Sequence, residues 1–333
     1  MRILANVTSR LNLVRSGFSS QPNIKSLGKL LHSEKENYES GQCFIHKKFG
    51  YKGVILKNWP TKFNCKDKLI EVNKKSIVDV YQVLADKSDL AKCESNLKSG
   101  LTVLHNYDKY SGVLHHLSGI DYAFHEDILP IEFEPDEPLD NPYLEEFFDY
   151  KDKKFTAKES LKEWLDLKEG FLASQNINHD ISNSVKVTVV TFFMGRKVLK
   201  FDNEEKTSRL WRYLVRIEYN DEDKIQLRER FWKIFSIDGS IESINGVGVI
   251  GKEPIFTRNS RVFQYHSHVQ INFPWAHMWG SYRFDREDGS SFDVRIPAFP
   301  LCDKSADQNE NTPIGMMNNI DSISDAKNNQ DDK

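Results

Sequence analysis

Along residues 185–302, apolar and polar side chains alternate with a period of two. The alternating apolar positions include Val185, Val187, Val189, Trp211, Tyr213, Val215, Ile217 and Tyr219. Similar stretches lie at 232–234, 241–249, 261–273, 278–284 and 292–296, with turns at Asp238-Gly239 and Asp288-Gly289. Since successive side chains of a strand point to opposite faces, the pattern predicts seven strands. Seven strands over about 115 residues indicate an immunoglobulin- or fibronectin-like β-sandwich at 185–302.

The first third of the chain also has strand character, but in shorter pieces. The stretch GQCFIHKKFGYKGVIL (41–56) alternates in segments around Gly50 and Gly53. Periodicity alone leaves 78–86 open between helix and strand, and its β-branched and aromatic content favours a strand. A last element, 119–130, ends at Pro130. Short strands with glycine at their corners predict a small, bent, β-barrel-like domain over 38–135.

A linker that contains a helix is expected over 136–184. The stretch 132–143 holds three prolines and five acidic residues, which is typical of a linker. Thr156 and Glu159 have the spacing of a capping box, which predicts a helix at 156–173. Its apolar stripe is Leu161, Trp164, Leu165, Phe171 and Leu172. Trp164 fits either packing in the joint between the domains or an anchor for a partner.

The two ends of the chain differ from the rest in composition. Residues 1–33 hold five Arg or Lys and no Asp or Glu, and apolar residues recur there at three- and four-residue steps. An Arg- and Ser-rich, acid-free, amphipathic segment is typical of a mitochondrial transit peptide, which we place at 1–35, with a merely disordered N-terminus as the alternative. Residues 303–333 have no aromatic residue and seven acids. That composition predicts a disordered acidic tail.

Charge and hydropathy exclude some classes of function. The net charge of the 333 residues is −3, so no basic field indicates a nucleic-acid partner. The mean hydropathy of −0.57 and the lack of a long uncharged apolar run argue against a membrane span. The cysteines, Cys43, Cys65, Cys93 and Cys302, form no C-x-x-C motif, so we expect buried free thiols.

The stretch NGVGVIG (245–251) is the one candidate ligand site, through Gly246, Gly248 and Gly251. It spells the dinucleotide fingerprint G-x-G-x-x-G, and with Lys252 it spells most of a phosphate-binding P-loop. Both motifs require a helix directly after the glycines, and Pro254 followed by another strand leaves no room for one. Glu253 also stands where a P-loop has a Ser or Thr for magnesium. We therefore interpret the glycines as a bulge or close backbone approach within a sheet.

Catalytic and metal sites are not predicted. His266 and His268 lie two apart on one strand face, together with Gln264 and Gln270. We interpret that face as solvated rather than as a metal site. Cys43 and His46 are three apart, which turns them to opposite faces of a strand. No nucleophile motif or zinc-protease motif is present, so we expect no enzyme activity and no cofactor.

Two segments resemble known families. Residues 185–301 resemble the ApaG domain through QLRERFWKIF (226–235), INGVGVIGKEPIF (244–256), FQYHSHV (263–269), HMWGSYRF (277–284) and FDVRIPAF (292–299). Residues 41–130 resemble the YccV/HspQ-like domain through GQCFIHKKFGYKGVILKNW (41–59), YQVLAD (81–86) and DYAFHEDILP (121–130). The two domains in this order, behind a basic presequence, resemble the polymerase delta-interacting protein 2 family.

This resemblance implies a non-catalytic adaptor found in mitochondria and in the nucleus. The partners it implies are the polymerase delta small subunit, the sliding clamp, the primase-polymerase and the mitochondrial ClpX protease system. Direct DNA binding through the YccV-like domain is the alternative. Residues 38–135 hold thirteen Lys, no Arg and thirteen acids, so that domain is neutral, which argues against a phosphate-reading role.

Overall fold

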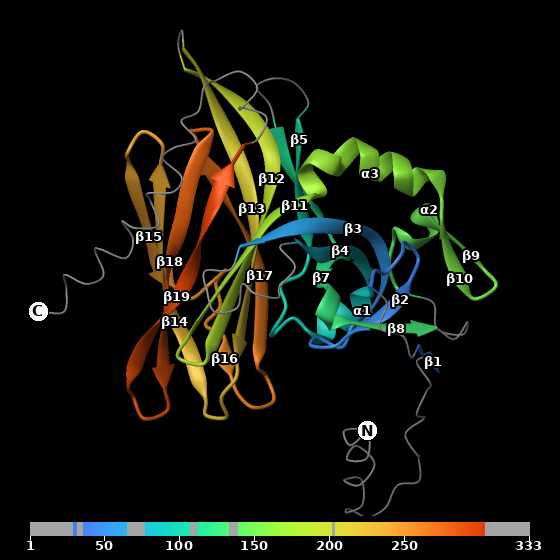
Figure 1. The fold of residues 1–333 in the computed structure, drawn as a ribbon, viewed down its shortest axis with the longest axis horizontal. Coiled ribbons are helices and arrows are strands. Elements are labelled where there is room, and N and C mark those ends of the chain that lie inside the picture. The colour runs from blue at the N-terminus through green and yellow to red at the C-terminus, as the bar shows by residue number, and fades with distance from the viewer. Residues whose placement is uncertain are drawn as a thin grey trace, which may run out of the picture.

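The computed structural model describes residues 29–31, 36–64, 77–106, 112–132, 139–201 and 204–303. Figure 1 shows two β-rich bodies side by side, with the long strands β12 and β13 between them. The mainly β fold class that the sequence predicts is confirmed. The proposed transit peptide lies almost entirely outside the described residues, as does the acidic tail after Asp303.

The first domain is built on a bent sheet. Its strands are β1 (Lys29–Leu30), β2 (Cys43–His46), β3 (Lys52–Asn64), β4 (Ile77–Ala85), β7 (Ile120–Phe124) and β8 (Ile128–Glu132). The turn η1 (His125–Asp127), the helix α1 (Lys87–Lys92) and a hairpin of β5 (Leu101–Asn106) and β6 (Gly112–Leu117) complete it. The register of β3 against β4 shifts between Ile55 and Lys57, which bends the sheet. The sheet does not close into a barrel within the described residues.

The segment expected to be a linker contains regular structure. It holds α2 (Leu144–Phe147), β9 (Phe148–Lys151), β10 (Lys154–Ala157), α3 (Glu159–Leu172) and β11 (Ser174–Ser182). The predicted capping box is wrong, because Thr156 pairs with Asp149 in the β9–β10 hairpin. Helix α3 therefore begins three residues later than expected, at Glu159, and its N-cap residue Lys158 makes no side-chain cap bond. Trp164 packs near Phe147, with ring centroids 5.3 Å apart, within the first domain's core.

The sandwich is formed by two sheets packed face to face. One contains β11, β12 (Val185–Phe201), β13 (Glu204–Tyr219) and β17 (Val262–Ile271). The other contains β15 (Ile241–Val247), β14 (Ile225–Ser236), β18 (Trp275–Arg286) and β19 (Ser291–Cys302), with the short β16 (Ile255–Phe256) beside β14. The alternating residues from the sequence fill the core between the sheets, including Val187, Trp211, Val215 and Ile217. The seven predicted strands are therefore present.

One sheet is continuous across both domains. Strand β11 pairs antiparallel with β12 and also parallel with β3, where Ile177 lies opposite Phe63. The sheet order is β1-β8-β2-β3-β11-β12-β13-β17. Strands β12 and β13 are thus covered on both faces, since Val190, Phe192 and Leu214 pack into the core of the first domain. The two domains share a backbone hydrogen-bond ladder as well as a side-chain interface.

Candidate binding site at the junction of the domains

Two arginines of β13 point away from the sandwich core and into the first domain. Arg212 and Arg216 alternate with the core residues Trp211, Tyr213 and Val215, which fixes them on the opposite face. Their exposed fractions are 0% and 1%. A buried guanidinium requires polar partners, because burying an unpaired charge costs several kcal/mol (~2–7 kcal/mol even for a neutral polar group). The first domain supplies those partners.

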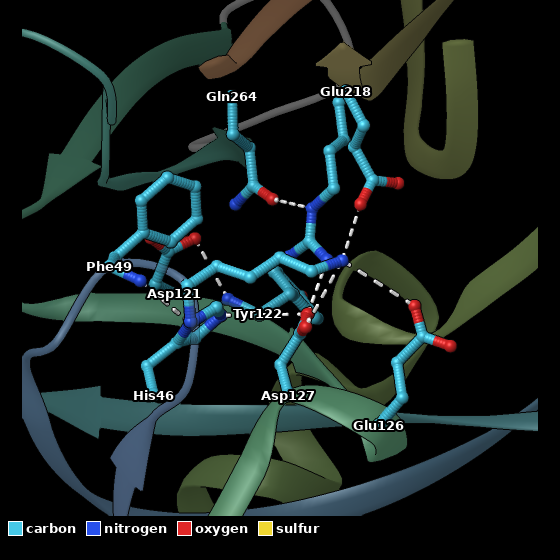
Figure 2. Close-up of polar contacts among 10 residues, drawn as sticks. His46, Phe49, Asp121, Tyr122, Glu126, Asp127, Glu218 and Gln264 are labelled. Carbon is cyan, nitrogen blue, oxygen red and sulfur yellow. Dashed lines mark hydrogen bonds and ion pairs between the residues drawn. The ribbon is translucent and has the colours of Figure 1, made fainter. Parts of the chain in front are cut away.

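Arg216 is the centre of this junction. Figure 2 shows polar side chains that converge there, among them Asp127, Gln264 and Glu218. Arg216 Nη1 donates to Oδ2 of Asp127 in η1, and its Nε donates to Oε1 of Gln264 over 2.8 Å. Its guanidinium also lies 4.3 Å from the ring centroid of Phe124, at cation–π distance. The ion pair joins the sandwich to the first domain, whereas Gln264 comes from the neighbouring sandwich strand β17.

The expectation that the Gln264 and His266 face is solvated is therefore wrong. The first domain covers this part of β17: Gln264 is 1% exposed, and His266 Nε2 lies 3.2 Å from Oδ1 of Asp121. Further along the strand His268 and Gln270 are exposed, as expected. No group of three metal-ligating side chains occurs among the described residues.

His46 is buried beside the ion pair and is held in its neutral form. Its Nδ1 accepts two backbone N–H groups, from Lys48 over 3.2 Å and from Phe49 over 3.3 Å. A nitrogen that accepts these bonds cannot carry a proton, so the hydrogen of the neutral ring is on Nε2, 3.7 Å from Oδ2 of Asp127. Burial lowers the pKa of His46 from 6.5 to about 3, although Asp127 acts in the opposite direction.

Lys48 and Glu218 complete the set that we call the junction charge cluster: Arg216, Asp127, His46, Lys48 and Glu218. The Lys48 ammonium donates to Glu218 Oε1 and lies 3.4 Å from Oδ1 of Asp127. Burial alone would raise the pKa of Asp127, but the charges of Arg216 and Lys48 outweigh it and lower that pKa. The pKa of Glu218 is lowered too, because Lys48 and Arg216 outweigh its burial. With His46 neutral, two cations balance two anions.

Arg212 forms a second contact between the domains. Its Nη2 donates to the Tyr122 hydroxyl over 3.0 Å, and its Nη1 donates to the Thr102 carbonyl over 3.2 Å. The guanidinium also lies 4.3 Å from the ring centroid of Phe192. Tyr122 in turn donates to the Leu172 carbonyl over 2.8 Å, so the end of α3 is tied to the same junction.

A groove of about 430 Å³, which we call the junction groove, opens beside this cluster. Its lining comes from both domains, with apolar walls from Phe63, Val78, Phe124 and Ile177. Arg216 and Glu218 lie at its polar side, and the acidic side chains Glu36, Asp79 and Glu126 are among its lining. Apolar walls with a few placed charges are typical of a binding site for a side chain or short peptide.

The thiol of Cys43, on the strand β2 that also holds His46, does not support catalysis. Cys43 is buried, and burial raises the pKa of its thiol to about 12. The reactive species of a cysteine is the thiolate, so this thiol is inert as a nucleophile at neutral pH. The arrangement at the junction is suited to binding, since its charged groups are already paired with one another.

The three glycines of the candidate ligand site lie elsewhere, at the far end of β15. Gly246 belongs to β15, and a Cβ there would come within 2.9 Å of the Arg230 guanidinium. Gly248 and Gly251 have positive φ angles of 57° and 74°, which form a tight turn before β16. Arg230 donates to the carbonyls of Val247 and Gly248 over 3.0 and 2.7 Å. The glycines thus serve a turn and the close approach of an arginine.

Comparison with known proteins agrees with this organisation. One family model, described as "Hemimethylated DNA-binding protein YccV like", matches residues 36–155, and another, the ApaG domain, matches 200–286. A mouse protein named polymerase delta-interacting protein 2 is 34% identical, over 93% of this chain and 87% of that protein. The human protein of that name is 36% identical, over 83% and 78%. The protein ApaG of Rhodospirillum centenum is 33% identical, over 37% of this chain and 90% of its own length.

We expect His46 to make the free energy of unfolding depend on pH. Its folded pKa lies below its usual value of 6.5, so under pH 6.5 the unfolded chain takes up a proton that the folded chain does not. Stability therefore falls between pH 6.5 and about pH 3, by roughly 2 kcal/mol from pH 6.5 to pH 5. Urea denaturation at a series of pH values measures this loss. Asp127 acts in a lower window, since its lowered pKa gives stability that is lost only below 3.8.

The variant His46→Asn removes the titrating ring but keeps an acceptor for the two backbone N–H groups. Between pH 6.5 and pH 5, its free energy of unfolding should fall by about 2 kcal/mol less than that of the wild type. His115→Asn is the matched control, because His115 is exposed in β6, and this variant should keep the wild-type slope. Equal slopes for wild type and His46→Asn would contradict the assignment.

Proposed function

We propose that this protein is a non-catalytic adaptor, because the chain belongs to the polymerase delta-interacting protein 2 family. Its proposed partners are the polymerase delta small subunit, the sliding clamp, the primase-polymerase and the mitochondrial ClpX protease system. The name of the relatives supports the polymerase class of partner. The other partners extend the proposal to a replication and proteolysis context.

The junction groove is the observation that best supports an adaptor role for this chain. Its walls come from two domains that are fixed by a continuous sheet and by the Arg216–Asp127 ion pair. A preformed site avoids much of the ordering cost of binding. The acidic lining from Glu36, Asp79 and Glu126 favours a partner segment that carries a basic side chain beside an apolar one.

The alternative of direct DNA binding depends on the description of the matched YccV-like family. Duplex recognition relies on a positive surface, and the counted charges of the first domain are balanced. Acidic side chains of that domain also line the junction groove. The adaptor role is therefore the better supported of the two.

Partner capture tests the adaptor proposal. A tagged mature chain should recover polymerase components or ClpX from a mitochondrial matrix extract. The charge-reversed variant Glu36→Lys/Asp79→Lys should recover about tenfold less, which corresponds to ~1.4 kcal/mol of lost binding. Glu163→Lys, on helix α3 outside the groove, is the matched control and should bind as wild type does.

The outcomes of this experiment separate two claims. Recovery of neither partner class by the wild-type chain would reject the adaptor role itself. Equal recovery by wild type and by the groove variant would leave the adaptor role standing and would reject the junction groove as its binding site.

We place the chain in the mitochondrial matrix, with a nuclear pool as the second location that the resemblance implies. The support is the acid-free, basic and amphipathic segment at 1–33. A fluorescent fusion should co-localise with a matrix marker, and deletion of residues 1–33 should abolish that signal. Unchanged localisation of the truncated fusion would overturn the assignment of the transit peptide.

A further inference from the structure

The edge strand β15 lies on the side of the sandwich away from the first domain, at the rim of the molecule in Figure 1. The other sandwich edges form hydrogen bonds with neighbouring segments of the chain. Loop residues Asn96 and Lys98 bond to the backbone of Gln264 on β17 over 2.9 and 2.8 Å. Along β19, side chains of Asn178, Asn183 and Ser182 bond to its backbone. On β15, the described residues form a ladder with β14 on one side alone.

This edge lacks the features that usually prevent pairing with another strand. Its sequence is IESINGV, with one charged residue and no proline or lysine. It pairs with β14 through seven successive residues, from Ile241 to Val247, without a bulge. Ile241, Ile244 and Val247 are 56%, 41% and 67% exposed. A regular, apolar, unprotected edge is a template for a further strand.

The sequence of β15 is complementary to itself when it is reversed about Ile244. In an antiparallel pair centred there, Ile244 lies opposite Ile244 of the other copy, and Ile241 lies opposite Val247. Ser243 lies opposite Asn245, and Glu242 lies opposite Gly246. Apolar residues therefore meet apolar residues on both faces of the pair, and the two glutamates do not face each other.

The charge of Glu242 also finds a partner in this register. Gly246 pairs with Arg230 of β14. The guanidinium of Arg230 lies within 3.0 Å of the position that a Cβ atom at residue 246 would take. The bonds from Arg230 to the carbonyls of Val247 and Gly248 hold the guanidinium there. A glutamate opposite Gly246 is thus placed beside this cation on the same face of the sheet, and the two-fold axis repeats the ion pair.

We propose that β15 pairs with β15 of a second copy of this chain, antiparallel and centred on Ile244. The contact is isologous, so it closes into a dimer and joins the two β15-containing sheets into one. It leaves the junction groove free, because no residue of β15 lines that groove. The proposal is thus independent of the adaptor role.

Disulfide trapping in the full mature chain tests the register. Ile244→Cys should give a disulfide-linked dimer on mild oxidation, because directly opposed residues have Cα atoms about 4.5–5.5 Å apart. Ile241→Cys alone and Val247→Cys alone should not, since each lies six residues from its own copy, about 20 Å along the strand. An equimolar mixture of those two variants should cross-link. The wild-type chain measures the background from its native cysteines.

Sedimentation equilibrium tests the dimer without cross-links. The wild-type chain should dimerise reversibly, with a dissociation constant below about 1 mM. Ile244→Lys should shift the dissociation constant at least tenfold, with an unchanged melting temperature, because the side chain is already exposed. Ile181→Lys, at 52% exposure on β11, is the matched control and should dimerise as wild type does. The proposal would be overturned if the wild-type chain were monomeric at about 1 mM, or if Ile244→Lys dimerised as the wild type does. It would also be overturned if the single Ile241→Cys and Val247→Cys variants cross-linked as well as their mixture.

Discussion

The buried ion pair between Arg216 and Asp127 is the interaction on which the arrangement of the two domains depends. Arg216 is on β13, whose other face forms the sandwich core, and Asp127 is in η1 of the first domain. A buried charge without its partner is costly, about 3–5 kcal/mol when one member is removed. The native docking therefore pairs the two groups with each other, and Gln264 and Lys48 add a hydrogen bond and a second ion pair beside the neutral His46.

The continuous sheet and the charge cluster together explain how a binding site is formed between domains. The β3–β11 ladder fixes the first domain against the sandwich by backbone hydrogen bonds, and the cluster fixes it by side chains. The junction groove takes its walls from both, so its shape is set by the docking and not by a flexible loop. Such a preformed surface avoids much of the ordering cost of binding.

The sequence predicted the sandwich core well and the junction poorly, for a physical reason. Alternation along β13 identifies Trp211, Tyr213 and Val215 as one face, but Arg212 and Arg216 on the other face have the pattern of solvated residues. Consecutive apolar residues at 189–190 and 192–194 were the available signal that β12 is buried on both faces.

Strand β11, SQNINHDIS, has too few apolar residues to be recognised from its sequence. Its pairing is determined by backbone hydrogen bonds to β3 and β12. Thr156 had a local capping pattern that strand pairing overrode.

The central claim is that Arg216 and Asp127 couple the two domains, and a double-mutant cycle measures that coupling directly. Free energies of unfolding would be determined by urea denaturation for wild type, Arg216→Met, Asp127→Asn and the double variant. We expect the sum of the two single losses in free energy of unfolding to exceed the loss in the double variant, with a coupling energy of about 2–3 kcal/mol. Additive losses, with a coupling energy within about 0.5 kcal/mol of zero, would contradict it.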